Sequence, residues 1–306
     1  MERVQDKVRV LVTGRDGQLG RALVERAASA FPDLLTVAIG RPEFDLADMA
    51  GIEMLVARAA PDVVINAAAY TAVDAAETDR QTAFAVNARG AGAVAAAAAR
   101  VGALVVHVST DYVFDGSKPG HYVETDSTAP LSVYGESKLA GELAVADAAP
   151  RHAIARTSWV HSAVGRNFVK TMLTLAATRD ELRVIDDQTG SPTYAPHLAD
   201  ALLAMARALA ARPAGDIAFG TYHVTGRGWT TWAGLAREVF AVSARLGGPT
   251  ARVVAIPTAD YPTPARRPQN SRLDCSRLER QCGLALPDWQ AGVERCVGRI
   301  LAAGGP

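Results

Sequence analysis

Cysteine is scarce in this chain of 306 residues, which contains three: Cys275, Cys282 and Cys296. Their spacings form no CxxC pair and no histidine lies among them, so we expect neither a disulfide framework nor a structural zinc site. An excess of one charge sign is also missing, because 32 lysines and arginines balance 32 acidic residues. A nucleic-acid-binding protein usually carries a basic excess. The sequence therefore predicts reduced thiols and no nucleic-acid partner.

Long hydrophobic runs are absent as well. The longest apolar stretch, Ala91 to Ala99, is much shorter than the roughly 20 residues needed to span a bilayer. The first residues, Met1 to Lys7, carry charges of alternating sign and lack the pattern of a signal peptide. We therefore expect a cytoplasmic protein with no membrane partner.

The first half of the chain alternates short apolar runs with longer alanine-rich segments. Nearly all-apolar strands that are separated by helices indicate a parallel sheet covered on both faces. This is the α/β, doubly wound (Rossmann) fold class, in which ligands bind at the carboxyl ends of the strands. The expected strands are Val8–Val12, Leu35–Ile39, Val63–Asn66, Leu104–Val108 and Ala153–Arg156, and the expected helices cover about 18–30, 48–59, 78–100 and 134–148.

After about residue 158 the alternation becomes irregular, and proline and glycine become frequent beyond residue 212. We expect a helix at 167–177, a strand at 183–186 and a helix at 197–211. This change in composition predicts a second, smaller α/β substrate lobe. The expected division gives residues 1–158 to a dinucleotide-binding domain, with a return segment around 184–212, and gives 159–183 and 213–306 to the smaller lobe.

A glycine-rich turn follows the first expected strand. Gly14, Gly17 and Gly20 have the spacing GxxGxxG and precede a helix. Glycines let the backbone turn tightly and approach a pyrophosphate, and the N-terminus of the helix offers free N–H groups to the phosphates. The turn therefore predicts a dinucleotide site, although an ordinary strand-to-helix turn has a similar pattern.

The next two strand ends bear on the choice of cofactor. Arg41 stands where NAD-dependent enzymes often place an acid, and an arginine there can pair with the 2′-phosphate of NADP. The alternative is that Arg41 simply faces solvent. Asp45 and Leu46 follow where the adenine would end, and Ala67–Ala69 leave room for a flat ligand after the third strand.

A tyrosine and a lysine in the pattern YxxxK carry the chemistry. Tyr134 and Lys138 would share one face of a helix, and the nearby ammonium should lower the pKa of the phenol from about 10. Such a phenol suits a general acid that gives a proton to a ketone oxygen as hydride reaches the carbon. A hydroxyl of Ser109 or Thr110, at the end of the fourth strand, could hold the same oxygen.

These motifs and their surroundings resemble the dTDP-4-dehydrorhamnose reductase family of the extended short-chain dehydrogenase/reductase superfamily. The resemblance covers nearly the whole chain in order. It includes Gly14–Gly20, Asn66–Asp74, Ser109–Gly116, Pro130–Glu142, Arg156–Val160, Asn167–Phe168, Asp187–Thr193 and Arg267–Ser271.

The resemblance implies reduction of dTDP-4-dehydro-L-rhamnose to dTDP-L-rhamnose by NADPH, with NADH as an alternative donor. It implies that Tyr134 is the proton donor, that Lys138 also holds the nicotinamide ribose and that Thr110 assists at the ketone. It further implies cofactor contacts at Gln18, Leu19, Asp45, Leu46, Ala67, Ala68 and Ala69, and nucleotide-sugar contacts at Thr110, Asp111, Trp159, Arg267 and Asn270. For Arg267, a structural salt bridge is an equal alternative.

Two departures from the family pattern qualify this resemblance. Some family members are dimers bridged by a divalent metal through carboxylates, one of them early in the first helix, where this chain has no acid before Glu25. We therefore expect no metal site and either a monomer or a homodimer. His161 stands where relatives commonly have an aromatic hydroxyl, which leaves the fit to the sugar open.

Two other functions are compatible with the same motifs. One is a reductase or epimerase that acts on another nucleotide sugar. The other is a non-catalytic regulatory subunit, because the regulatory subunit of methionine adenosyltransferase resembles the same family.

Overall fold

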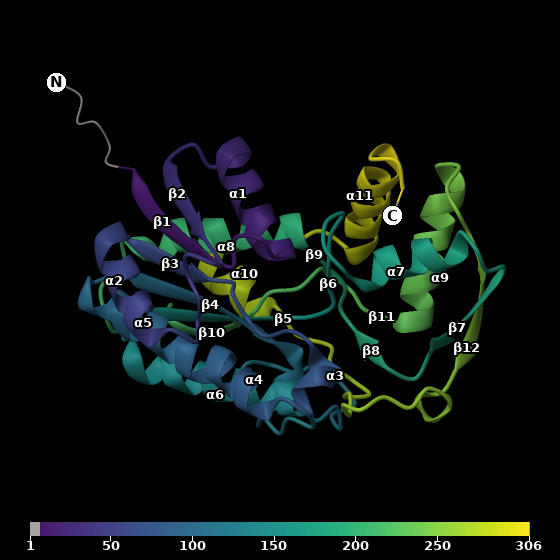
Figure 1. The fold of residues 1–306 in the computed structure, drawn as a ribbon, viewed down its shortest axis with the longest axis horizontal. Helices are drawn as coiled ribbons and strands as arrows, with labels where there is room; N and C mark the ends of the chain where they lie inside the picture. Colours follow the sequence, from purple (N-terminus) through teal and green to yellow (C-terminus); the bar gives the residue numbers. More distant parts are fainter. Residues whose placement is uncertain (1–6, 306) are drawn as a thin grey trace.

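Six strands form a central parallel sheet in the computed structural model, which describes residues 7–305 (Figure 1). The chain runs from β1 to β2 on one side and then returns to β3 on the other, so the sheet has a switch point between β1 and β3, as in doubly wound folds. The expected Rossmann class is confirmed. In sheet order the strands are β10 (Gly220–His223), β5 (His152–Thr157), β4 (Leu104–Thr110), β3 (Val63–Asn66), β1 (Val8–Thr13) and β2 (Leu34–Ile39).

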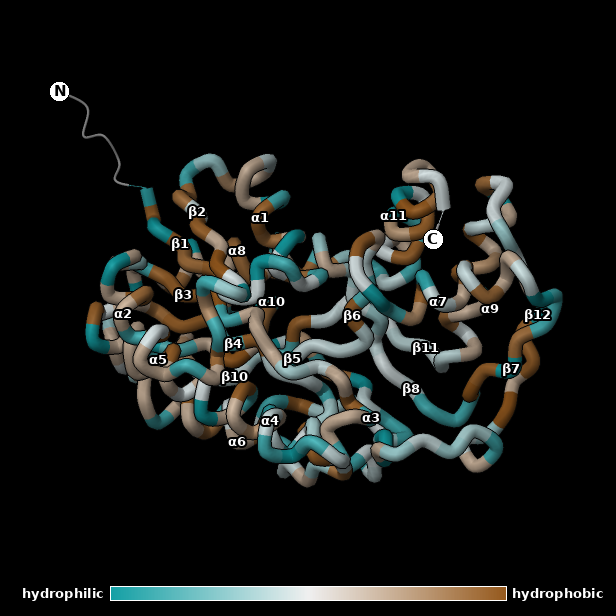
Figure 2. The backbone as a smooth tube through the Cα atoms, in the orientation of Figure 1, coloured by the Kyte–Doolittle hydropathy of each residue, from teal (hydrophilic) through white to brown (hydrophobic). Residues whose placement is uncertain are grey.

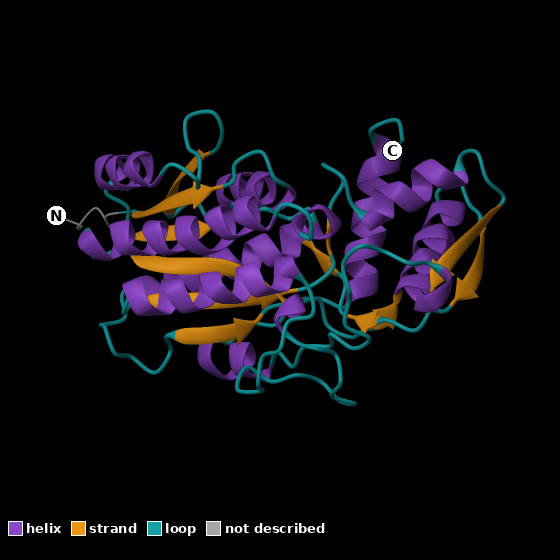
Figure 3. Ribbon diagram, turned by 60° about the horizontal axis from the view of Figure 1, so that its bottom comes forward, coloured by secondary structure: helices purple, strands orange, loops and turns teal. Residues whose placement is uncertain are grey.

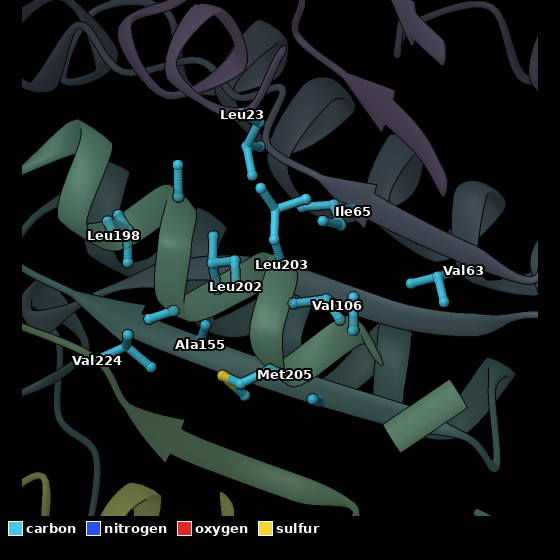
Figure 4. Packing of buried hydrophobic residues seen from close by; sticks show 14 of the residues in the cluster. Leu23, Val63, Ile65, Val106, Ala155, Leu198, Leu202, Leu203, Met205 and Val224 are labelled. Atoms are coloured by element: carbon cyan, nitrogen blue, oxygen red, sulfur yellow. The ribbon is translucent and has the colours of Figure 1, made fainter. Parts of the chain in front are cut away.

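Helices cover both faces of this sheet because successive side chains of each strand point to opposite faces. On one face, Val63, Ile65 and Val106 pack against the helices α1 (Gln18–Ala30) and α8 (Ala195–Ala210) (Figure 4). The opposite face packs against α2 (Met49–Ala59), α5 (Ala91–Arg100) and α6 (Val133–Ala148). The sheet with these helices is called the larger part below.

The helix expected over 78–100 is interrupted. The structure has α3 (Val73–Ala76), α4 (Arg80–Phe84), a π-helical segment η1 (Ala85–Gly90) and then α5. Asn87, in η1, bonds through its side chain to the backbone N–H and C=O of Tyr70 and to the hydroxyl of Ser137. These partners are distant in the sequence, and their hydrogen bonds stabilise the π-helical turn of η1.

A smaller part packs beside the larger one, on the right of Figure 1. Its core contains Val169, Leu235, Val239 and Val293. Its strand β7 (Glu181–Ile185), in which exposed charged residues alternate with apolar ones, lies at the edge of Figure 2. It is built from α7 (Phe168–Ala176), α9 (Trp232–Arg245), α11 (Trp289–Ala302) and the paired strands β7 (Glu181–Ile185) and β12 (Arg252–Ile256) (Figure 3).

Short elements connect the two parts. The two-residue strands form the pairs β6 (Val160–His161) with β9 (Thr193–Tyr194) and β8 (Thr189–Gly190) with β11 (Thr230–Thr231). The remaining elements are the 3₁₀ turns η2 (Asp111–Val113) and η3 (Thr258–Asp260) and the helix α10 (Ser276–Cys282).

The structure differs from the expected division of the chain at β10. The expected division gives 213–306 to the smaller lobe, but Gly220–His223 pairs with β5 and extends the central sheet. This strand has only four residues and a half-buried pattern, so it lacks the apolar run by which the other strands were found.

Of the expectations about membranes and targeting, one concerns residues that the structure describes and the other does not. Among residues 7–305, no helix combines the length and the apolar character needed to cross a membrane. The expectation that Met1–Lys7 is not a signal peptide concerns residues 1–6, which lie outside the described residues.

Candidate active site

A cavity of about 1070 Å³ opens at the carboxyl ends of the central strands. It collects residues from the glycine turn, from the ends of β2, β3 and β4, and from α6. Most of the residues predicted for the site line it: Gly14, Gly17, Gln18, Leu19, Arg41, Asp45, Leu46, Ala67, Ala68, Ala69, Thr110, Asp111, Tyr134, Lys138 and Trp159.

The glycine turn has the conformation that its sequence predicts. Gly14 has φ +81°, and a Cβ added there would lie 2.9 Å from the backbone of Ala68, so only glycine allows this close approach to β3. Gly17 occupies the N-cap of α1 without a side-chain cap, and the first turn of α1 contains no acid. The free N–H groups of this helix end therefore fit a phosphate.

Gly20 serves packing and does not line the cavity. A Cβ at this position would lie 2.0 Å from the carbonyl oxygen of Gly14. Glycine here lets α1 pack tightly against the turn, which is the role of the third glycine in such motifs.

The loop after β2 presents Arg41 to the cavity. Arg41 is exposed, and its carbonyl oxygen accepts a hydrogen bond from Arg15 Nη2 at 3.4 Å. Arg15 also pairs with Glu43 at 3.3 Å. The carboxylate of Asp45 accepts the N–H of Ala47 at 2.9 Å, which shapes the loop that carries Leu46.

Tyr134 and Lys138 lie one turn apart on α6, whose N-terminus is capped by Ser132. Burial raises the pKa of Tyr134 to about 12, with the Thr110 hydroxyl acting in the opposite direction. Burial lowers the pKa of Lys138 to about 8, while Glu142 acts to raise it. The expectation that the lysine lowers the tyrosine pKa is therefore wrong for this structure, because burial is the largest influence on the phenol and Lys138 is not among the groups that shift its pKa.

The two hydroxyls at the end of β4 have different partners. Ser109 donates to Glu142 at 2.5 Å, and Glu142 is held by a bidentate ion pair with buried Arg156, with contacts of 2.7 and 2.9 Å. Thr110 donates to Asp111 Oδ1 at 3.0 Å. Both hydroxyls therefore donate to a carboxylate in this structure, and Thr110 is the one that also acts on the Tyr134 phenol.

Asp111 brings an unusual carboxyl group to the cavity. It is 2% exposed, and its Oδ2 has no hydrogen-bond partner among the described residues. Burial raises its pKa to about 7, while hydroxyls of Ser271 and Thr110 act to lower it. An unpaired buried carboxyl oxygen is costly unless a ligand completes its hydrogen bonds.

Trp159 is held in place from several sides. Its φ is +47°, which is unusual for a bulky residue. Its indole stacks on Trp232 with ring centroids 3.5 Å apart and planes 6° apart. A Cβ at Gly190 would lie 2.5 Å from the ring. Sequence reasoning did not find Trp232, which belongs to no recognisable motif.

Arg267 and Asn270, expected to contact the substrate, are not brought to the cavity wall. Arg267 forms an ion pair with Asp74 at 2.8 Å, which is the structural alternative considered for it. The amide of Asn270 donates to the carbonyl oxygens of Lys118 and Gly120 at 2.6 and 2.7 Å. The polar groups of both side chains therefore already bind other parts of the protein, and these contacts hold loops in place.

His161 is also buried and stands away from the cavity lining. Its Nδ1 lies 3.3 Å from the carbonyl oxygen of Trp159, and burial lowers its pKa to about 4. Arg166 and Ser158 do line the cavity, and sequence reasoning missed them. Ser158 lies within the matched segment Arg156–Val160, and Arg166 lies next to the matched Asn167–Phe168.

Comparisons with known proteins agree over almost the full length. The sequence model of the RmlD substrate binding domain matches residues 8–301. A dTDP-4-dehydrorhamnose reductase of Sinorhizobium fredii is 49% identical over 297 residues, which cover 97% of this chain and 99% of the relative. The enzyme of the same name from Escherichia coli K12 is 44% identical over 95% of this chain and 98% of its own length.

Solved structures show the same relationship. A dTDP-4-dehydrorhamnose reductase from Clostridium acetobutylicum superposes with a TM-score of 0.89 at 34% identity, covering 96% of this chain and 100% of the other. One from Bacillus anthracis, solved in complex with NADP, gives a TM-score of 0.88 at 35% identity over 96% and 99% of the two chains. The chain belongs to the dTDP-4-dehydrorhamnose reductase family.

Proposed function

We propose that this protein reduces the C4 ketone of dTDP-4-dehydro-L-rhamnose to give dTDP-L-rhamnose in dTDP-rhamnose synthesis. The observation that carries the proposal is the meeting of Thr110, Tyr134 and Lys138 in one cavity with the glycine turn. The relatives named for this reaction support the choice of substrate.

NADPH would lie across the switch point, with its pyrophosphate at the N-terminus of α1, and would supply hydride to the ketone carbon. Gly14 and Gly17 would admit the pyrophosphate, and Arg41 would face the 2′-phosphate. The relative solved with NADP supports this preference. NADH is the alternative donor.

Side chains of the protein would supply the proton that the ketone oxygen receives. With its pKa raised to about 12, Tyr134 holds its proton at neutral pH and gives it to the ketone oxygen as negative charge develops there. Thr110 would hold the same oxygen by a hydrogen bond. Lys138 would hold the nicotinamide ribose and return a proton to the phenolate.

The substrate would meet Asp111 and Trp159. The free Oδ2 of Asp111 suits a sugar hydroxyl, because that contact would satisfy a buried polar atom. The indole of Trp159, fixed by its stack on Trp232, offers an apolar surface to the nucleotide sugar. Free cysteines at 275, 282 and 296 fit a cytoplasmic location.

A spectrophotometric assay tests the proposal. Purified protein should oxidise NADPH with dTDP-4-dehydro-L-rhamnose faster than with UDP- or GDP-linked 4-keto sugars. Protein that retains bound NAD through purification and consumes no added cofactor would favour an epimerase. No oxidation with any sugar in the panel would favour a regulatory subunit.

A further inference from the structure

Three buried polar side chains stand next to one another across the central sheet, behind Lys138. Thr13 of β1 is in register with Asn66 of β3, and Asn66 is in register with His107 of β4. Each of the three is at most 1% exposed. Polar groups buried this deeply require hydrogen-bond partners.

Hydrogen bonds join these side chains into one chain. Thr13 Oγ1 lies 2.7 Å from Asn66 Oδ1, and Asn66 Nδ2 lies 3.1 Å from His107 Nδ1. His107 Nε2 lies 3.5 Å from Lys138 Nζ. At the other end, the backbone N–H of Ala68 donates to Thr13 Oγ1 at 3.2 Å. The chain therefore connects the cavity wall at Ala68 with the lysine.

The backbone group at Ala68 sets the direction of this chain, because an N–H can only donate. With the Asn66 oxygen facing Thr13, the threonine accepts from Ala68 and donates to the amide oxygen. In the opposite orientation, both neighbours donate to Thr13, and its own proton has no acceptor among the contacts of the described residues. The Asn66 nitrogen therefore donates to Nδ1 of His107, and the ring carries its proton on Nε2.

This Nε2–H faces Lys138. An ammonium group has three donors and no acceptor, so a ring N–H directed at it disfavours the charged form, whereas an amine can accept that hydrogen bond. The pKa of His107 is held well below its ordinary value by burial and by the lysine charge, which keeps the ring singly protonated. Gly141 of α6 lies beside the ring, since a Cβ there would make an ordinary contact with Nε2 at 3.6 Å.

We propose that this chain, with its direction fixed by Ala68, presents the ring N–H of His107 to Lys138 and so favours release of a proton from the lysine. His107 is then a positioning residue, and the catalytic meaning of the inference rests on the proposed function. When Tyr134 has given its proton to the ketone oxygen, the phenolate takes a proton from the ammonium. The resulting amine accepts the His107 N–H until solvent returns a proton.

The other charged and titratable groups around Lys138 act in the opposite direction or are neutral. Glu142, one turn further along α6, favours the ammonium form, although its charge is paired with Arg156 of β5. Asp111 lines the same cavity and in its ionised form also favours the ammonium. The Tyr134 phenol is uncharged at neutral pH. Burial opposes the carboxylates, and in the proposal the ring N–H of His107 acts in the same direction as burial.

The first experiment determines which nitrogen of His107 carries the proton. The protein is labelled with ¹⁵N in its six histidine rings, and the signals that vanish in His107→Phe are assigned to His107. We expect a protonated Nε2 and an unprotonated Nδ1 at neutral pH in the wild-type protein. A proton on Nδ1, or on both nitrogens, overturns the proposal.

The second experiment titrates Lys138 by NMR, which is simple because the lysines are Lys7, Lys118, Lys138 and Lys170. The Lys138 signal is identified by its loss in Lys138→Met. In Thr13→Val the Asn66 amide can turn over, so that the His107 proton moves to Nδ1 and Nε2 accepts a hydrogen bond from Lys138. The ammonium form is then favoured, and the titration midpoint of Lys138 should rise by about half to one pH unit. Thr13→Ser should restore the wild-type midpoint.

Thr36→Val is the matched control, because Thr36 lies on the neighbouring strand β2 and its buried hydroxyl has no partner among the described residues. Its midpoint should equal that of the wild type. An unchanged or lower midpoint in Thr13→Val overturns the proposal, and if this variant does not fold, the ring measurement decides alone. Neither experiment uses a substrate, so their outcome is independent of whether the protein reduces a nucleotide sugar.

Discussion

At the scale of single residues, Tyr134 and its surroundings determine whether the cavity can carry out a reduction. Its phenol keeps its proton over the physiological range, because burial raises its pKa to about 12. A strong general acid is not required when the ketone oxygen gains charge as hydride arrives. In the proposed reaction, the proton has to be held at the correct place and replaced from Lys138.

Tyr134→Phe removes this proton and leaves the ring in place. Turnover should fall by roughly 10²–10⁴-fold, the usual contribution of a general acid, while the affinity for NADPH stays nearly unchanged. Steady-state rates and a cofactor titration by fluorescence check both points. Tyr261→Phe, at an exposed tyrosine, is the control, and wild-type turnover in Tyr134→Phe would show that another group supplies the proton.

Arg41 is the residue by which we expect the protein to distinguish the two dinucleotides. Arg41→Ala should weaken NADPH binding and leave NADH binding almost unchanged, since only NADPH carries the 2′-phosphate. Dissociation constants for both cofactors measure the effect. Arg280→Ala, on α10 and outside the cavity lining, controls for a general loss of positive charge. Equal losses for both cofactors would assign Arg41 a structural or general electrostatic role.

At the scale of helices and strands, the site depends on how closely α6 approaches η1. A Cβ at Gly141 would lie 2.0 Å from the carbonyl oxygen of Asn87, so the two segments touch through backbone atoms. Both segments contribute to the site, because Lys138 and Tyr134 lie on α6 and Asn87 fixes the Tyr70 backbone.

Gly141→Ala should therefore lower the free energy of unfolding by about 1–3 kcal/mol, the typical cost of overpacking. Urea denaturation followed by circular dichroism measures this change. At Gly120 an added Cβ meets no atom within 4 Å, so Gly120→Ala serves as the control and should unfold as the wild type does. Equal stability of the two variants would mean that α6 can shift without cost.

The strands and helices of the first half could be predicted from the sequence because their apolar runs and glycine turns are local signals. The interruption at η1 could not, since it depends on bonds from Asn87 to Tyr70 and Ser137. β10 was missed because its residues, GTYH, contain no apolar run, unlike the equally short β3. Most of the candidate site followed from motifs, whereas the engagement of Asn270 with loop carbonyls and the stack of Trp232 on Trp159 depend on the tertiary fold.

At the scale of the whole molecule, assembly and metal dependence are linked questions. Among residues 7–305 no group of three or more His, Cys, Asp or Glu side chains is arranged to hold a metal ion. The acid of α1, Glu25, is paired within the chain with Arg299 of α11 at 2.9 and 3.1 Å. A divalent cation needs several converging oxygens.

We therefore expect activity and oligomeric state to be insensitive to EDTA. Light scattering with and without chelator, together with the NADPH oxidation assay, measures both. Dissociation on chelation that Mg²⁺ reverses would show that carboxylates of two protomers share a metal. Loss of activity without dissociation would instead indicate a metal on the substrate diphosphate.

The path of the chain between the larger and the smaller part determines whether the two parts can unfold separately. After β5 it enters the smaller part for α7 and β7, returns to the sheet for α8 and β10, leaves again for α9 and β12, and passes α10 before ending in α11 (Figure 1). No single cut separates one part from the other, because each is made of interleaved stretches. Calorimetry should accordingly record one melting transition, and a protease nick between β10 and α9 should leave two fragments that stay associated until both parts melt together.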